Sequence, residues 1–454
     1  MLKVGKWKAS IGIALLVFAL ALAGCSSNSG SSSPSQASQS PAGSAAPSGD
    51  NASERTLTVM VRSYANTSEK DQWEKVAAAF EAQNKDIRVV LSPGDITVES
   101  GKLTTMLNSG VTPPDAILMS AGPARVGVLS NADLILPMNE LYEKYNWKDQ
   151  LLPFAYEMAT MKETIYELPH SVDFIGIAYN EKIFDEIGMP FPATKEQFYP
   201  TMDKLTEAGY TPLALGVRGG FASSWLFGQI LEAVAGTENM EKLFFGEAKW
   251  TDPPYVEAAE LLKEWVDKGV IAKESVSLTA DDQKAMFLQN KAAFLTVFPY
   301  YIGDFVQNNS ADSTGITLLP SFTEGLTVKP TGGLGYTWVI PKKAENVDLV
   351  ERWLNFIMTD YTKIMFEDPT SNLIPANKTA FETTPASPMM AAMVDALKNG
   401  TGYNPTVYIG NNTKEAYLQS LQGLIGGMIT PQEAMKNTEE GRLKDVAEGF
   451  KLRE

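Results

Sequence analysis

The segment that most constrains the fold is residues 168–181, which read LPHSVDFIGIAYNE. Residues 172–179 predict a buried, apolar strand, yet this strand contains one acid, Asp173, and one glycine, Gly176. Charged residues are rare inside strands, and glycine weakens them. We therefore predict a strand that contributes to a site as well as to a core.

The rest of the chain from residue 55 alternates between strand and helix patterns. Apolar strand patterns at 55–61, 87–91 and 115–119 are separated by a helical pattern that begins at Ser68 and by another at 95–109, and the same alternation resumes after residue 194. In the first of these helices Trp73, Val76, Ala77 and Phe80 predict one buried stripe, and Thr279 and Thr430 are the predicted caps of two later helices. This order predicts an α/β fold of mostly parallel sheets flanked by helices. Two strand patterns, 168–180 and 315–321, are the candidates for connecting two lobes.

The first 24 residues predict a secretory signal peptide, because three lysines precede an apolar run at 11–22 that is too short to span a bilayer. The sequence Leu22-Ala23-Gly24-Cys25 resembles a bacterial lipobox, which implies cleavage before Cys25 and lipid attachment to its sulfur. The alternative is an ordinary cleavage site that happens to precede a cysteine. Residues 25–54 are rich in Ser, Ala, Gly and Pro and predict a flexible tether.

Composition excludes several functions. The formal net charge is −16, which argues against binding to nucleic acid and favours a neutral ligand. With one cysteine, Cys25, and one histidine, His170, no internal disulfide or Cys/His metal cluster can form, and a catalytic triad would need His170 itself. We predict no cofactor and no metal, although acidic loops leave a calcium site with oxygen ligands open.

Candidate site residues lie in loops that follow predicted strands, where ligands of α/β proteins bind. Arg62 and Tyr64 follow the first strand, and Ser120 and Gly122 follow the third. A solvated loop and a plain turn are the respective structural alternatives.

The order of residues at 168–200, 285–300 and 331–358 resembles that of the extracellular carbohydrate-binding proteins of ABC importers (family 1 solute-binding lipoproteins, similar to maltose-binding protein). This resemblance implies a periplasmic-binding-protein fold with two lobes, formed by 55–170 with 320–375 and by 171–319 with 376–454. It implies a non-enzymatic subunit that captures a sugar or oligosaccharide and delivers it to permease subunits powered by a separate ATPase. Such a protein would be anchored through Cys25 to the outer face of a Gram-positive-type cell membrane.

The resemblance also implies roles for individual residues. Asp173 would accept hydrogen bonds from sugar hydroxyls, and Trp225 would stack on a sugar face; a hinge carboxylate and a core tryptophan are the alternatives. Tyr300 stands where the family commonly has the tryptophan of a Gly-Pro-Trp turn, with Phe298 in place of the glycine. Further ligand contacts are implied at Gly333, Tyr336 and Asn411.

Two other functions remain possible on the residues alone. A secreted glycoside hydrolase needs two carboxylates flanking one bond, and with 54 acidic residues some pair lies close by chance. An adhesin or structural lipoprotein would not need a strand with an embedded Asp173.

Overall fold

The computed structural model describes residues 54–64, 67–98, 100–160 and 163–450, which belong to one compact unit. The predicted signal peptide (1–24), nearly all of the predicted tether (25–54) and Cys25 lie outside the described residues.

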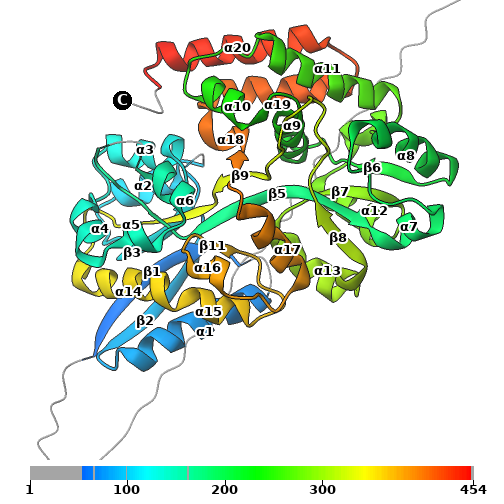
Figure 1. Cartoon of the computed structure of the whole chain (residues 1–454). Helices are drawn as coiled ribbons and strands as arrows, with labels where there is room; N and C mark the ends of the chain where they lie inside the picture. The colour runs from blue at the N-terminus through cyan, green and yellow to red at the C-terminus, as the bar shows by residue number, and fades with distance from the viewer. Residues whose placement is uncertain (1–53, 65–66, 99, 161–162, 451–454) are drawn as a thin grey trace, which may run out of the picture. The chain divides into compact units, whose positions relative to one another are not determined.

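The first sheet has the strand order β2 (Ile87–Gly94), β1 (Arg55–Arg62), β3 (Ala116–Ser120), β10 (Tyr336–Val339) and β4 (Leu168–Pro169). Strands β1, β2 and β3, labelled in Figure 1, are parallel. Strand β10 runs antiparallel to β3 and β4. Leu57, Val59 and Val61 alternate along β1 and are fully buried, as the strand pattern predicts. The carboxyl ends of β1 and β3 lie together and bring Arg62 and Ser120 to one edge.

The second sheet is built around β5 (Ser171–Asn180). Its order is β12 (Gly402–Tyr403), β9 (Thr331–Leu334), β5, β7 (Ala292–Val297) and β6 (Thr211–Ala214), and both β8 (Thr314–Thr317) and β11 (Ile374–Pro375) also pair with β5. All four partners of β5 run antiparallel to it. The expectation of a mostly parallel sheet is therefore wrong here, because the central strand enters from the first sheet rather than through a helical crossover.

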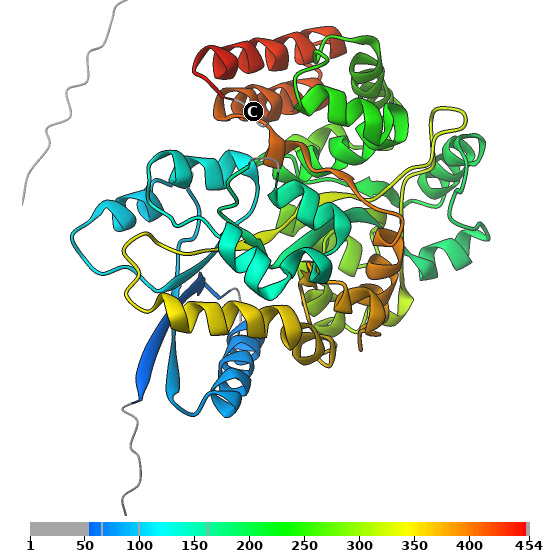
Figure 2. The ribbon, with the colours of Figure 1, turned by 60° about the vertical axis from the view of Figure 1, so that its left-hand side comes forward.

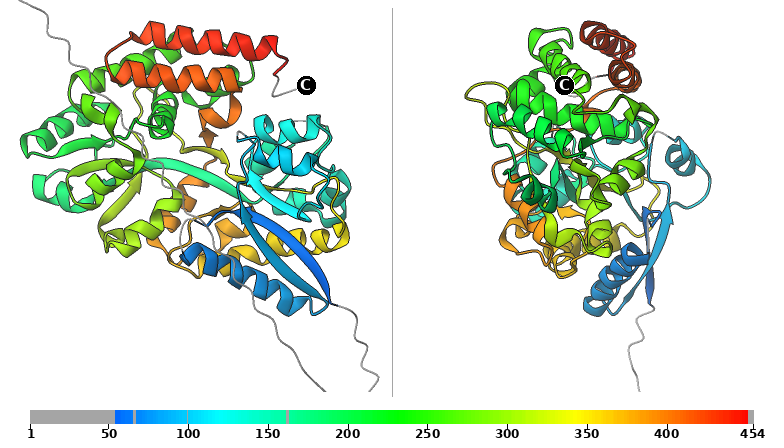
Figure 3. Two further views of the ribbon diagram at one scale, coloured as in Figure 1. Left: turned by 180° about the vertical axis from the view of Figure 1, so that it is seen from behind. Right: turned by 90° about the vertical axis from the view of Figure 1, so that its right-hand side faces the viewer.

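The chain passes between the two sheets at strands that are nearly continuous. β4 and β5 are separated only by His170, and β9 and β10 only by Gly335. Figure 3 shows from behind how β5 extends from the first sheet through the second. The prediction that 315–321 forms a crossover is wrong, because β8 pairs only within the second sheet; the return passage is 331–339.

A further connection follows β11. Asn377 forms an isolated bridge with Leu151 beside the first sheet, and the chain then reaches α17 (Pro388–Leu397), which packs against β8 of the second sheet. Among the described residues, the sheets are thus connected through three passages.

Helices cover the first sheet. They are α1 (Thr67–Gln83), α2 (Lys102–Asn108), α3 (Pro123–Asn131), α4 (Asn139–Tyr145), α5 (Trp147–Gln150), α6 (Pro153–Ala159), α14 (Val347–Thr359) and α15 (Tyr361–Phe366). The predicted apolar stripe of α1 is confirmed, since Trp73, Val76, Ala77 and Phe80 are buried. α1 lies beside α14 (Figure 2), where the ring centroids of Phe80 and Trp353 are 5.2 Å apart.

The helix predicted at 95–109 is shorter than expected and begins only at Lys102. The carboxylate of Asp95 accepts hydrogen bonds from the backbone amide and the hydroxyl of Thr97. Such a local turn competes with helix formation.

The remaining helices follow the strands of the second sheet or form the carboxyl-terminal region. They are α7 (Glu181–Ile187), α8 (Lys195–Glu207), α9 (Phe221–Val234), α10 (Gly236–Phe244), α11 (Pro253–Asp267), η1 (Lys273–Ser277), α12 (Ala280–Leu288), η2 (Pro299–Tyr301), α13 (Ile302–Gln307), η3 (Ala311–Ser313), α16 (Thr379–Glu382), α18 (Pro405–Tyr408), α19 (Asn411–Ile425) and α20 (Pro431–Ala447). The side chains of Thr279 and Thr430 cap α12 and α20, as predicted.

Among the described residues, no helix has the length and hydrophobicity of a membrane span, and no three potential metal-ligating side chains lie together.

Candidate functional site

A cavity of about 500 Å³ lies where the carboxyl ends of β1 and β3 face α9, η2 and α18 across β5. We call it the cleft. The described residues that line it are Arg62, Thr97, Ser120, Arg125, Val172, Asp173, Phe221, Trp225, Phe298, Pro299, Tyr300, Gly335, Tyr336, Asn372, Leu373, Asn404, Thr406, Val407 and Lys414.

Aromatic side chains from α9 and η2 form one wall of the cleft. The ring centroids of Trp225 and Phe298 lie 3.8 Å apart at an interplanar angle of 66°, and Tyr300 lies 5.4 Å from Phe298. Phe221, one turn before Trp225, is 48% exposed, and Tyr300 is 43% exposed. The wall therefore presents ring surface that an apolar sugar face can cover.

The opposite wall is polar and is built on the first sheet. The Arg62 guanidinium pairs with Glu69 at 2.6 Å and lies 5.9 Å from the ring centroid of Tyr336. Tyr336 is paired with Ser120 across β10 and β3, which places both at the same level of the cleft. Burial raises the pKa of Tyr336, so its hydroxyl stays protonated and can donate.

Asp173 lies at the floor of the cleft in β5, opposite Gly333 of β9. Burial raises the pKa of its carboxyl to about 6, while the charge of Arg125 acts in the opposite direction. The backbone of Gly335 lies so close that a Cβ there would be 2.5 Å from Asp173 Oδ1. The glycine thus allows the carboxyl to lie beside the second passage between the sheets.

Four predicted site residues do not line the cleft. Tyr64 packs against the main hydrophobic core, and Asn411 is exposed at the start of α19. Gly122 has a φ of 111° and approaches Val407 so closely that a Cβ would lie 2.7 Å from Val407 Cγ1. A Cβ on Gly333 would lie 2.5 Å from the hydroxyl oxygen of Tyr408.

Several lining residues were not predicted, although some lie near predicted ones. Phe221 belongs to the same segment as Trp225, Arg125 lies three residues after Gly122, and Lys414 lies three residues after Asn411. Helical spacing from the predicted positions could have indicated Arg125 and Lys414. Asn372, Asn404 and Thr406 come from loops and a short helix with no preceding sequence signal.

His170 and Glu167 are buried behind the cleft. Trp338 Nε1 donates to His170 Nδ1 at 3.1 Å, and burial lowers the pKa of His170 to about 3, so the imidazole is neutral. Trp73 stacks on its ring at 5.7 Å. These contacts assign His170 a packing role between the sheets and leave it away from the cleft.

A smaller, polar hollow of about 350 Å³ shares Arg62, Tyr300 and Asn372 with the cleft. It lies between α1 and the α12–α13 region, where Lys284 pairs with Asp304 at 2.6 Å. The shared residues make it a side extension of the cleft.

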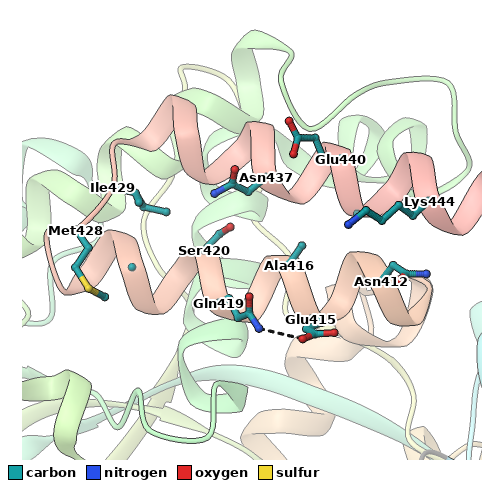
Figure 4. A pocket seen from close by; sticks show the side chains of 12 residues that line it. Asn412, Glu415, Ala416, Gln419, Ser420, Met428, Ile429, Asn437, Glu440 and Lys444 are labelled. Atoms are coloured by element: carbon teal, nitrogen blue, oxygen red, sulfur yellow. Dashed lines mark hydrogen bonds between the residues drawn. The ribbon is translucent and has the colours of Figure 1, made fainter.

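Another hollow of about 500 Å³ runs between α19 and α20 (Figure 4). Its described lining residues are Asn412, Glu415, Ala416, Gln419, Ser420, Gly423, Met428, Ile429, Asn437, Glu440, Gly441 and Lys444. None of these is aromatic. We call it the helix groove.

The chemistry of the cleft suits binding rather than bond cleavage. Glycoside hydrolysis needs two carboxylates across one bond, whereas Asp173 is the one carboxylate among the described residues that line the cleft. Rings on one side and amides, hydroxyls and cations on the other are suited to hold a polar, ring-shaped ligand.

Comparisons with known proteins agree with this geometry. A family model described as bacterial extracellular solute-binding protein matches residues 64–361. The chain is 24% identical over 382 residues to an uncharacterized ABC transporter extracellular-binding protein of Pyrococcus horikoshii, covering 82% of this chain and 83% of that protein. It is also 24% identical over 328 residues to the melibiose/raffinose/stachyose-binding protein MelE of Bacillus subtilis, covering 70% and 73%.

Solved structures share the fold. One described as a chitin oligosaccharide binding protein has a TM-score of 0.73 and 23% identity, and covers 86% of this chain and 99% of its own. An ABC transporter solute-binding protein from Thermotoga lettingae, bound with α-D-tagatose, has a TM-score of 0.69 and 20% identity, with coverage of 86% and 99%. Together with the two sheets joined by β5, and with a family model that matches about two thirds of the sequence, these findings show that the chain belongs to the family of bacterial extracellular solute-binding proteins.

Proposed function

We propose that this protein captures a carbohydrate in the cleft and delivers it to the permease of an ABC importer. The observation that carries the proposal is the pairing of the aromatic wall around Trp225 with the polar wall around Arg62 and Ser120. Aromatic rings cover the apolar faces of sugar rings, and fixed polar groups bond their hydroxyls. As a member of the solute-binding family the protein is a binding subunit and not an enzyme.

Six of the predicted residues are the proposed ligand contacts: Arg62, Ser120, Asp173, Trp225, Tyr300 and Tyr336. Arg62, Ser120 and Tyr336 come from the first sheet, whereas Trp225 and Tyr300 come from the other side of the cleft. A ligand that contacts both sides of the cleft favours the closed state, in which the two sides lie close together. Moving such an equilibrium from 1:99 to 99:1 requires about 5.5 kcal/mol of preference for one state.

The lobes that we propose follow the passages between the sheets. The boundaries expected at residues 170 and 375 lie near His170 and β11, and the boundary expected near 320 moves to Gly335, where β9 gives way to β10. The hinge of the protein would comprise these three places.

Anchoring and delivery complete the proposal. The lipobox-like sequence before Cys25 and the tether at 25–54 support a lipid-anchored protein at the extracellular face of a cell membrane. Relatives named as ABC transporter binding proteins support separate permease and ATPase subunits as its partners.

Calorimetry with a glycan panel, combined with analysis of the products, tests the proposal. We expect at least one oligosaccharide to bind with a Kd of about 1 μM or lower, and to be recovered intact. Release of reducing sugar would instead support a hydrolase, and absence of binding across the panel would contradict the proposal.

A further inference from the structure

The cleft has a charge opposite to that of the protein as a whole. The chain carries a net charge of −16, yet the described residues that line the cleft include three cations, Arg62, Arg125 and Lys414, against one acid, Asp173. A cavity with low-dielectric walls concentrates the potential of the charges that line it. The overall charge, from which we expected a neutral ligand, therefore does not describe the binding site.

Two of these cations lie in the first turns of their helices. Arg125 is in the first turn of α3 and Lys414 in the first turn of α19, and neither helix has an acid in that turn. The amino-terminal end of a helix carries partial positive charge, so a cation there is unfavourable and an anion favourable. Acids from other elements offset this at both helices, because the Glu167 carboxylate accepts from the backbone amide of Gly122 before α3, and the Asp445 carboxylate accepts from the amides of Asn412 and Thr413 in α19. An anion in the cleft would therefore meet the side-chain cations rather than these helix ends.

The cations also approach the cleft from both sides. Arg62 ends β1 and Arg125 lies in the first turn of α3, next to the first sheet, whereas Lys414 belongs to the carboxyl-terminal helices. Burial raises the pKa of Tyr336, Arg62 and Arg125 act against that shift, and Asp173 and Glu69 add to it, so two cations and two acids lie within electrostatic reach of this phenol. An anion bound near Tyr336 can therefore interact with both arginines, and Lys414 lines the same cleft from the other side.

We infer that the ligand is an acidic oligosaccharide whose uronic acid carboxylate binds between Arg62, Arg125 and Lys414 while its rings lie on the aromatic wall around Trp225. This inference rests on the proposed function and names the substrate class. Arginine presents donors in a fork that matches a carboxylate, and charge-assisted hydrogen bonds are stronger than neutral ones.

Arg62 and Arg125 can bind a carboxylate even though each of them also contacts another group of the protein. Arg62 pairs with Glu69 through Nε, and Arg125 Nη1 donates to the carbonyl of Ala121 at 3.1 Å. A guanidinium has five N–H donors, so one such contact leaves it able to bind a second acceptor. The side extension adds the balanced pair Lys284–Asp304 and the carboxylate of Glu69, the partner of Arg62, so the described lining residues of both hollows together hold four cations against three acids.

Matched ligands test the inference. Oligogalacturonates, oligoalginates and glucuronic-acid-substituted xylo-oligosaccharides are each titrated into the protein beside their carboxyl-reduced, neutral forms. We expect at least one acidic ligand to bind about tenfold or more tightly than its reduced form. Raising NaCl from about 0.05 M to about 0.5 M should lower the ratio of acidic to reduced affinity, because salt screens the charges.

Variants locate the effect. Arg125→Gln and Lys414→Gln should each lower the ratio of acidic to reduced affinity by about fivefold or more. Lys436→Gln removes the same charge from an exposed position on α20 outside the cleft and should leave the ratio within about twofold of the unmodified protein.

The outcomes separate the inference from the function on which it rests. Equal or tighter binding of the reduced forms, or binding of sulfated but not carboxylated ligands, overturns the inference and leaves carbohydrate capture standing. An unchanged ratio of acidic to reduced affinity in both Arg125→Gln and Lys414→Gln also overturns the inference. Absence of binding by acidic, reduced and neutral glycans alike contradicts the proposed function itself.

Discussion

The cleft and the helix groove have the same volume, about 500 Å³ each, and differ in almost everything else. The cleft is lined by five aromatic side chains drawn from separate parts of the chain, whereas the groove is lined by neighbouring turns of two consecutive helices (Figure 4). A hollow between packed helices forms wherever small residues meet, as at Ala416 and Gly441. Volume therefore does not identify a site, but a convergence of rings, amides and charges from distant segments does.

The largest expected effect concerns the buried wall behind the cleft. Burial raises the pKa of Glu167 from 4.5 to about 7, whereas the backbone amide of Gly122 acts in the opposite direction. The pKa of Glu167 is higher in the folded than in the unfolded protein. Its contribution to the free energy of unfolding is therefore fully present below about pH 4.5 and is lost as the pH rises through about 7. The loss amounts to about 3 kcal/mol.

Glu167→Gln should remove this dependence. Denaturant unfolding between pH 4 and pH 8 measures it as a change in the stability difference between variant and unmodified protein. Glu440→Gln, in the helix groove, provides the baseline for the same substitution at an exposed position. A constant difference across the range for Glu167→Gln would mean that the carboxyl is not destabilised by burial.

The next effect concerns the aromatic wall. Trp225→Ala should weaken binding of the best glycan about thirtyfold, or about 2 kcal/mol, because it removes a ring face that the sugar covers and the ring that packs against Phe298 at 3.8 Å. Calorimetry measures the affinity, and Trp225→Phe, which keeps a smaller ring, should lose less. Unchanged affinity in a folded Trp225→Ala protein would assign this residue to the core.

Removal of the acid at the floor should have a smaller effect. Asp173→Ala should weaken binding at least tenfold, about 1.4 kcal/mol, since the hydroxyl groups of the ligand lose an acceptor. Asp173→Asn keeps one acceptor oxygen and should retain more affinity. Tighter binding by the alanine variant would show that the acidic group of the ligand lies against Asp173, not against the cations.

Changes in the helix groove should have the smallest effect. Gln419→Ala and Met428→Ser alter its lining, and Met428 is 74% exposed. We expect glycan affinity to stay within about twofold and stability within about 0.5 kcal/mol. A tenfold loss of affinity from either change would extend the binding site to the groove and end the contrast between the two hollows.

The parts of the fold that were predictable are those with local signals. The stripe from Trp73 to Phe80 and the cap at Thr279 depend on residues close in sequence, and both were predicted correctly. The prediction of a crossover at 315–321 was wrong because the sequence pattern of a short apolar strand does not indicate which sheet the strand joins. The antiparallel pairing of the strands beside β5 was missed for the same reason, since the local sequence of a strand does not show which strand it pairs with.

The site divides in the same way. Trp225 and Tyr300 were predicted because they follow recognisable segments, and both line the cleft. Gly122 was expected to face a ligand, yet its neighbour is Val407, which lies far away along the chain. Contacts of that kind arise only when the carboxyl-terminal region folds back, so Val407 carries no signal in its own neighbourhood.

The three passages between the sheets have a consequence for how the protein can be divided. Neither sheet is formed by one continuous stretch of sequence. A fragment ending near residue 170 would lack β10, which lies between β3 and β4, so the first sheet could not form completely. Cutting the backbone at one passage would leave two covalent links in place. Proteases that nick a single hinge strand should therefore leave a particle that still holds together in native buffer and separates only under denaturing conditions.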